Sequence, residues 1–185
     1  MIKAFKVGLR LAGADVLGSS SYLRDLGGPV TLASFNAAPE REAVAAMLAC
    51  CASSRFAAAM AAGRPYPSLA ASLAAAETVF ESLTWPDVLE AMDAHPRIGA
   101  RVSGQSAAEQ SGVADDSRAA LRAGNAAYEE RFGHVFLICA TGLSGAQMLT
   151  ALDQRLKNDE SSERVVATAE LRKITVLRVR KALAG

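Results

Sequence analysis

Apolar residues recur every three or four positions through most of the chain, from Thr31 onward. This spacing places them on one face of an α-helix, and capping residues, glycine or proline separate the runs. The pattern predicts helices over 39–51, 53–60, 68–80, 84–92, 115–128, 144–157 and 162–183. No internal repeat or second domain is visible. The sequence therefore predicts an all-α fold, a compact multi-helix single domain that is not a simple four-helix bundle.

Several predicted helices begin with residues that accept hydrogen bonds from free amides of the first turn. Ser53 or Ser54, Ser68 and Thr84 have this position, and Pro86 suits the first turn after Thr84. The predicted inward stripe of the helix after Pro39 is Val44, Met47, Leu48 and Cys51.

Two internal stretches break the helical pattern. Residues 95–105 contain a proline and two glycines and have no apolar period, so we expect a loop there. Residues 135–139 are apolar and rich enough in β-branched side chains to form a strand by propensity. In an otherwise helical chain we expect them to be a buried extended or helical segment.

The first 30 residues differ from the rest of the chain. They contain Gly18-Ser19-Ser20-Ser21 and Gly27-Gly28-Pro29, with little apolar periodicity between these flexible stretches. We expect residues 1–30 to be a flexible extension and residues 31–185 to form the domain.

Charge and cysteine content narrow the possible partners. Lys and Arg number 20 against 19 Asp and Glu, and aromatic residues make up 5% of the chain, which argues against nucleic acid as the main partner. Three cysteines, two of them adjacent, do not form a disulfide framework and suggest a reducing cytosol. No apolar run reaches the roughly 20 residues that span a bilayer. We therefore expect a cytoplasmic protein with no membrane partner.

His95, one of two histidines, follows a predicted helix and precedes Pro96. A histidine at such a junction can lean over a cleft between helices and exchange a proton near neutral pH. The competing interpretation is a helix-terminal histidine favoured by the helix dipole.

Ser106-Ala-Ala-Glu109-Gln110 also allows two interpretations. The S-x-x-E spacing is that of a capping box, in which both side chains only start a helix. A helix start also presents free N–H groups, a hydroxyl, a carboxylate and an amide to a polar ligand.

Arg178 falls on the apolar side of the last predicted helix, where a guanidinium needs an anionic partner from the protein or from a ligand. Arg131, by contrast, has the position of an ordinary cation in the last turn of a helix. A phosphate-binding glycine loop, a G-x-S-x-G elbow and an H-E-x-x-H motif do not occur, and His134 and Cys139 lack partners at zinc-binding spacing.

Six motifs occur in the order seen in one enzyme family. They are His95-Pro96-Arg97-Ile98-Gly99, Ser106-x-x-Glu109-Gln110, Asn125-x-x-Tyr128-x-x-Arg131-Phe132-Gly133, Phe136-x-Ile138-Cys139, Arg155-Leu156-x-Asn158 and Ile174-x-x-Leu177-Arg178. Leu32-x-x-Phe35-Asn36 fits as well. In these motifs, over about residues 31–180, the chain resembles the decarboxylases of 2-oxo-4-hydroxy-4-carboxy-5-ureidoimidazoline (OHCU).

The resemblance implies a compact all-α enzyme, commonly a homodimer, that converts this small ureidoimidazoline substrate to (S)-allantoin in urate degradation. It implies no metal and no organic cofactor, because the ring C=N of the substrate can accept the electrons of the breaking bond. The alternative is a non-catalytic helical binding module on the same scaffold.

The resemblance also implies roles for individual residues. His95 would be the general acid/base and Glu109 its catalytic companion. Arg178 would face the substrate carboxylate. The remaining pocket residues would be Pro96, Ser106 and Gln110, together with the backbone of His134, Val135, Phe136, Leu137 and Ile138. The family often has an apolar aromatic residue where His134 stands.

Overall fold

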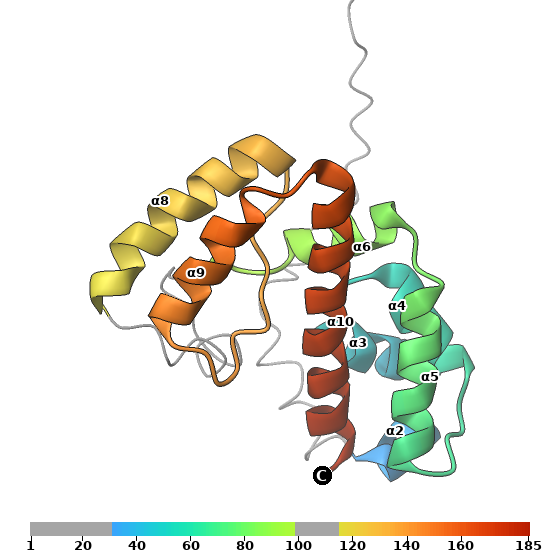
Figure 1. Cartoon of the computed structure of the whole chain (residues 1–185). Coiled ribbons are helices and arrows are strands. Elements are labelled where there is room, and N and C mark those ends of the chain that lie inside the picture. Colours follow the sequence, from blue (N-terminus) through green and yellow to red (C-terminus); the bar gives the residue numbers. More distant parts are fainter. Residues whose placement is uncertain (1–30, 99–114) are drawn as a thin grey trace, which may run out of the picture.

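The computed structural model describes residues 31–98 and 115–185, and within these ranges it is built from helices (Figure 1). This confirms the predicted all-α fold. The helices of the described residues are α2 (Leu32–Ala37), α3 (Glu40–Cys50), α4 (Ser54–Ala62), α5 (Leu69–Glu81), α6 (Trp85–Asp93), α8 (Asp115–Phe132), α9 (Gly145–Arg155) and α10 (Glu160–Leu183). The predicted extension, residues 1–30, lies outside the described residues.

The helices begin at the capping residues that the sequence offers. Ser53, not Ser54, caps α4, since its hydroxyl accepts the Phe56 amide at 3.3 Å. Ser68 caps α5 in the same way. The N-cap of α6 is Thr84, whose backbone N–H donates to the Asp87 carboxylate at 2.8 Å. These local hydrogen bonds satisfy amides that have no partner within the helix.

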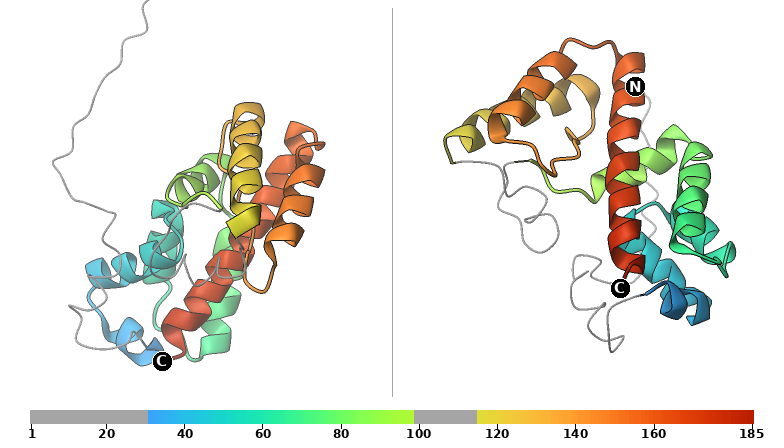
Figure 2. Two further views of the ribbon diagram at one scale, coloured as in Figure 1. Left: turned by 90° about the vertical axis from the view of Figure 1, so that its left-hand side faces the viewer. Right: turned by 60° about the horizontal axis from the view of Figure 1, so that its bottom comes forward.

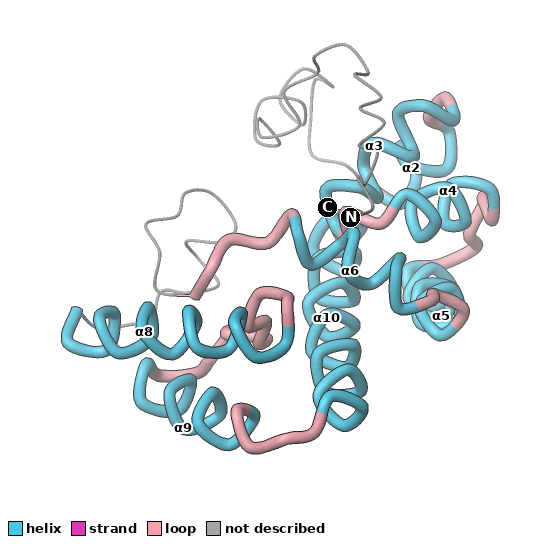
Figure 3. Tube along the Cα trace, turned by 90° about the horizontal axis from the view of Figure 1, so that it is seen from above, coloured by secondary structure: helices cyan, strands magenta, loops and turns pink. Residues whose placement is uncertain are grey.

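Helix α10 stands between two groups of helices. Figures 1 and 3 show α8 and α9 on one side of it and α2 to α5 on the other. It packs against α3, α5 and α6, while α8 packs against α9. Its end returns to the start of the described chain, where Ala184 forms an isolated β-bridge with Thr31, and Figure 2 shows the C-terminus beside α2.

Two separate groups of buried side chains stabilise this arrangement. The larger core joins α2 to α6 with α10 and contains Phe35, Met47, Phe56, Met92 and Leu171. The smaller core joins α8 and α9 and contains Leu121, Tyr128, Phe136, Met148 and Leu152.

Residues 135–139 lie between the two cores. Phe136 and Ile138 belong to the smaller core, whereas Leu137 belongs to the larger one, with Val135 and Cys139 packed against it. Alternation with a period of two is that of an extended chain. The expectation of a buried extended segment is confirmed, and burial on both sides explains why every side chain in it is apolar.

The predicted inward stripe of α3 is partly wrong. The helix buries Ala43, Ala46, Met47 and Cys50, whereas Leu48 is 37% exposed. Helix α3 packs most extensively against α4, and small alanine side chains allow the two backbones to approach closely. Met47 and Cys51 of the predicted stripe are nevertheless buried, and Val44 packs against the larger core. The error therefore concerns Leu48.

None of the helices in residues 31–98 and 115–185 combines the length and apolar character needed to cross a lipid bilayer.

Candidate active site

His95 lies directly after α6, at its predicted position, and is only 9% exposed. Its Nδ1 lies 2.9 Å from the carbonyl oxygen of Ala91 in the last turn of α6. Its Nε2 lies 3.2 Å from Nη1 of Arg178. The two interpretations of this histidine therefore coexist, because one ring nitrogen bonds the helix end and the other faces a polar partner.

These two contacts fix the orientation of the His95 ring. The Ala91 carbonyl can only accept, so Nδ1 carries a proton and donates it to this oxygen. The other ring nitrogen, Nε2, lies beside the Arg178 guanidinium of α10.

Arg178 reaches this position from α10, where Leu171 and Ile174 are buried on the same side. Its charge also acts on the thiols of Cys50 and Cys51 at the end of α3. Burial raises the pKa of the Cys50 thiol to about 12, more than the charge of Arg178 lowers it. Both cysteines are buried, as expected for core residues, and neither is a candidate nucleophile.

The loop after His95 is attached to α8. Arg97 and Glu129 form two parallel hydrogen bonds, Nε to Oε1 at 2.5 Å and Nη2 to Oε2 at 2.6 Å. The buried Asn125 side chain donates to the Ile98 carbonyl at 2.7 Å. Pro96 therefore lies in the chain between His95 and two residues, Arg97 and Ile98, that hydrogen bonds hold against α8.

The segment from His134 to Ile138 is held through its backbone. Arg155 Nη1 donates to the Leu137 carbonyl at 2.6 Å, and the Cys139 amide donates to Glu170 Oε2 at 2.8 Å. Phe136, Leu137 and Ile138 are buried in the two cores. Their side chains therefore build the protein interior, and only their main chain could serve a ligand.

The His134 side chain lies among aromatic rings. The ring centroids of Trp85, Tyr128 and Phe132 lie 5.3, 5.4 and 6.2 Å from that of the imidazole. Burial lowers the pKa of His134, which keeps the ring neutral. These contacts are those of an aromatic core residue, in keeping with the aromatic residue that the family often has here.

A buried polar network around Glu163 was not predicted from the sequence. Glu163 is fully buried, and its carboxylate accepts hydrogen bonds from Arg155, Asn158 and the Tyr128 hydroxyl. Burial raises the pKa of the Tyr128 phenol, so that it remains a donor. Arg155, Asn158 and Tyr128 stand in the motifs that carried the family resemblance, but their spacing does not reveal that they converge on one carboxylate.

Three predicted site residues, Ser106, Glu109 and Gln110, lie outside the described residues. In the part of the chain that the structure describes, no three His, Cys, Asp or Glu side chains gather closely enough to hold a metal ion.

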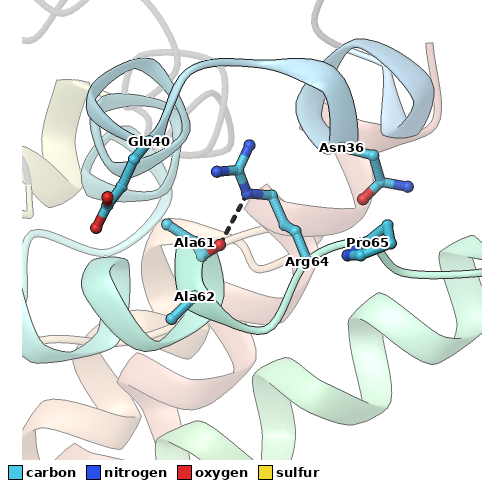
Figure 4. Close-up of a pocket in the computed structure, with 6 residues that line it drawn as sticks. All are labelled: Asn36, Glu40, Ala61, Ala62, Arg64 and Pro65. Carbon is cyan, nitrogen blue, oxygen red and sulfur yellow. Dashed lines mark hydrogen bonds between the residues drawn. The ribbon is translucent and has the colours of Figure 1, made fainter.

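A surface pocket elsewhere on the molecule lies beside α2 and α4 (Figure 4). Its wall includes Arg64, which donates from Nε to the Ala61 carbonyl and from Nη1 to the carbonyls of Phe35 and Ala38. These contacts join the ends of two helices. They are structural and do not make the pocket a candidate site.

Comparison with known proteins relates the chain to one family. The family model of OHCU decarboxylases matches residues 36–180. The chain is 38% identical over 144 residues to the uric acid degradation bifunctional protein TTL of Arabidopsis thaliana, a match that covers 71% of this chain and 44% of that protein. It is 44% identical over 55 residues to the 2-oxo-4-hydroxy-4-carboxy-5-ureidoimidazoline decarboxylase of Amia calva, covering 30% of this chain and 31% of that protein. The matched part is thus less than half the length of either curated relative.

Two solved structures have a similar fold. An OHCU decarboxylase crystallised in the presence of (S)-allantoin superimposes with a TM-score of 0.66 at 33% identity, over 77% of this chain and 96% of that one. An (S)-allantoin synthase superimposes with a TM-score of 0.65 at 19% identity, over 84% of this chain and 54% of that one, which supports the fold alone.

Proposed function

This chain belongs to the OHCU decarboxylase family, and from this premise we propose that it decarboxylates 2-oxo-4-hydroxy-4-carboxy-5-ureidoimidazoline to (S)-allantoin without a cofactor. The observation that carries the proposal is the 3.2 Å contact between His95 Nε2 and Arg178 Nη1. It brings together an imidazole and a guanidinium that stand 83 residues apart in the sequence. A general base beside a carboxylate-binding cation suits a substrate that carries both an acidic group and an ionisable hydroxyl.

In the proposed reaction, the bond between the ring carbon and its carboxylate breaks and carbon dioxide leaves. The electron pair forms a C=C bond in the ring, and the electrons of the substrate C=N group pass to its nitrogen, which takes up a proton from solvent. His95 Nε2 then takes the proton of the ring hydroxyl, so that the carbonyl of allantoin forms and the C=C electrons return to the neighbouring ring carbon. Delivery of that proton from His95 to one face of this carbon gives a single enantiomer.

The other predicted site residues complete the proposed pocket. Arg178 would orient the carboxylate across the ring plane, because too strong a grip on it would stabilise the ground state and oppose the loss of neutral carbon dioxide. Glu109 would orient the ureido or ring N–H groups, and Ser106 and Gln110 would line the pocket with Pro96. The main chain of residues 134–138 would hold the ring. This division of roles makes positioning and charge placement the main contribution of the protein.

The deciding experiment uses substrate prepared fresh from urate by the two preceding enzymatic steps. A decarboxylase should produce optically active allantoin faster than the spontaneous reaction does. The rival function, a non-catalytic binding module, predicts that the same protein binds (S)-allantoin without changing the rate or the optical activity of the product. Unchanged activity after dialysis against a chelator would support the cofactor-free reaction.

Residues 31–185 form the catalytic domain in this proposal, with residues 1–30 as an extension. We also propose that the chain works as a homodimer in the cytoplasm. The free, buried cysteines Cys50 and Cys51 suit a reducing compartment. Light scattering at micromolar concentration would test the oligomeric state, since a monomeric mass would contradict it.

A further inference from the structure

A carboxylate and a guanidinium are buried together behind the extended segment 135–139. The Glu163 side chain has no exposed surface and that of Arg155 is 8% exposed. Arg155 donates to Glu163 Oε1 from Nε at 2.8 Å and from Nη2 at 2.6 Å. Asn158 Nδ2 donates to the other oxygen, Oε2, at 2.8 Å. Both oxygens of the buried carboxylate are therefore occupied.

Arg155 uses its remaining terminal nitrogen on the main chain of the segment. Nη1 donates to the Leu137 carbonyl at 2.6 Å. The guanidinium also lies 4.7 Å from the Phe136 ring centroid and 5.6 Å from that of Tyr128. Contacts with two adjacent rings and hydrogen bonds to a carboxylate and a carbonyl hold this side chain in one position.

A second hydrogen bond holds the same edge of the segment 135–139. The Cys139 amide donates to Glu170 of α10, two turns after Glu163. In an extended chain the carbonyl of residue 137 and the amide of residue 139 point to one edge, and the main-chain groups of residues 136 and 138 point to the other. Arg155 and Glu170 therefore fix the position and the orientation of the opposite edge, which the main-chain groups of residues 136 and 138 form.

A buried ion pair of this kind gives little net stability compared with apolar side chains of the same size, because both charges must be removed from water. An energetic role is thus a weak explanation for Arg155 and Glu163. A geometric role is stronger, because two donors on Glu163 Oε1 convert a flexible side chain into a rigid support for one carbonyl.

We propose that Arg155, fixed by Glu163, is a positioning residue that sets the register of the substrate-facing main chain of residues 134–138. The inference rests on the proposed function, in which that main chain holds the substrate ring. Arg155 acts through Leu137 and does not touch the reacting atoms. Its loss should therefore misplace the ring relative to His95 and Arg178, and not remove a chemical group.

Arg155→Lys is the sharpest variant, because lysine keeps the charge opposite Glu163 but cannot form the fork to Glu163 and Leu137 together. Glu170→Ala loosens the same edge from a partly exposed position and gives a second, milder test. Met60→Ala serves as the control, because Met60 is fully buried in α4 within the larger core, and its loss destabilises the fold without removing a hydrogen bond of the segment.

Five measurements on the full chain separate positioning from stability. Three concern function: kcat and KM with fresh substrate, the optical purity of the allantoin formed, and calorimetric binding of (S)-allantoin. Two concern structure: amide hydrogen exchange of peptides covering 135–139 and the melting temperature. For Arg155→Lys we expect kcat/KM per folded molecule to fall at least ~10-fold, since small misplacements of reacting groups are costly. Product optical purity and (S)-allantoin affinity should fall with it, and peptides covering 135–139 should exchange amide hydrogens faster. Glu170→Ala should show the same changes to a smaller extent, whereas Met60→Ala should only lower the melting temperature.

Folded Arg155→Lys with wild-type kcat/KM and (S)-allantoin affinity would overturn the inference and leave the proposed function intact. If that variant does not fold, wild-type behaviour of Glu170→Ala would overturn it as well. If Met60→Ala lost as much kcat/KM and (S)-allantoin affinity as Arg155→Lys, the effect would be one of stability, and this result would also refute positioning. If the wild-type chain neither converts the substrate nor binds (S)-allantoin, the proposed function fails and the inference falls with it.

Discussion

The two histidines occupy opposite kinds of environment, and this difference assigns their roles. His95 bonds a helix carbonyl through Nδ1 and faces Arg178 through Nε2. His134 is enclosed by aromatic rings, with Nδ1 3.2 Å from the carbonyl oxygen of Val135. A ring held by polar partners at both nitrogens can exchange a proton in a defined direction, whereas a ring packed among aromatics stabilises the fold.

His95→Ala should therefore lower kcat by at least ~10²-fold, the usual contribution of a general acid/base, while the helical circular dichroism spectrum stays unchanged. The matched control is His134→Phe, which replaces the other histidine by an aromatic residue and should keep most of the activity. Near-wild-type stereoselective turnover by folded His95→Ala would contradict the assignment of this residue.

The second histidine should make the protein sensitive to acid. Burial lowers the pKa of His134 in the folded state from the ordinary value of 6.5, so the unfolded chain binds a proton that the folded chain does not. Stability is then fully present above about pH 6.5 and falls as the pH drops below it, by at most about 1.4 kcal/mol per pH unit. Urea unfolding of His134→Phe should show a flatter dependence between pH 6.5 and 5 than the wild type. Parallel curves for the two proteins would show that His134 titrates normally.

Arg178 and Arg131 provide a test of which cation meets the substrate carboxylate. Arg178 lies against His95, whereas Arg131 is exposed and donates to the Asn158 carbonyl at 2.8 Å. Arg178→Lys should weaken binding of a carboxylate-bearing substrate analogue more than that of allantoin, which lacks the carboxylate, since lysine cannot form two parallel bonds. Arg131→Lys should leave both affinities unchanged. The reverse pattern in calorimetry would identify Arg131 as the binding residue.

The junction between α8 and the extended segment depends on one glycine. Gly133 ends α8 with φ of 73°, and a Cβ atom built there would meet no atom within 4 Å. Gly133→Ala should therefore destabilise the fold through backbone strain alone, by about 1 kcal/mol. Gly133→Asn should cost less, because asparagine tolerates the left-handed region better. Equal melting temperatures for wild type and Gly133→Ala would show that the helix end relaxes to another conformation.

The helices could be predicted from the sequence because caps and apolar spacing are local signals. Ser68, Thr84 and Gly133 each mark a boundary that the structure contains. The buried face of α3 could be predicted only in part, because the exposure of Leu48 depends on how closely an alanine-rich surface packs against α4. The segment 135–139 was recognised as buried, but its alternation between two cores depends on α10 passing beside it.

The candidate site shows the same division. The positions of His95 and Arg178, at a helix end and on an apolar helix face, made them candidates, whereas their roles came from the family resemblance. The structure brings the two side chains together. The role of the Glu163 carboxylate could not be predicted from the sequence, since its partners come from three separate parts of the chain. These partners are Tyr128, Asn158 and Arg155. Contacts between distant elements leave no periodic signal in a sequence.

At the largest scale, the molecule is two cores joined by the segment 135–139, and α10 of the larger core reaches the smaller one through Glu163. The candidate site lies on this shared boundary: His95 follows α6 of the larger core, Arg178 lies on α10, and the loop through Ile98 packs into the smaller core. Relative displacement of the cores would therefore alter the site directly. The networks of Arg155 with Glu163 and of Arg97 with Glu129 fasten the boundary on the side of the smaller core.

The larger core is closed by the first described residues. Thr31 caps α2 and forms the bridge with Ala184, and Phe35 of α2 is 1% exposed and stacks on Tyr66. The domain boundary proposed between residues 30 and 31 thus falls immediately before Thr31, the first residue that the structure describes, which forms a bridge with Ala184.

Deletion of residues 1–30 should accordingly leave the melting temperature and kcat/KM within error of the full chain. The matched control deletes residues 1–38 and removes Phe35 together with the carbonyl acceptors of Arg64 at Phe35 and Ala38. Loss of a buried phenylalanine side chain alone costs about 3–5 kcal/mol, so the longer deletion should melt well below the shorter one. Because α2 packs mainly on α3, the longer deletion should lower the folded fraction more than the activity of each folded molecule. A shorter deletion that already lost stability would place part of residues 1–30 inside the domain.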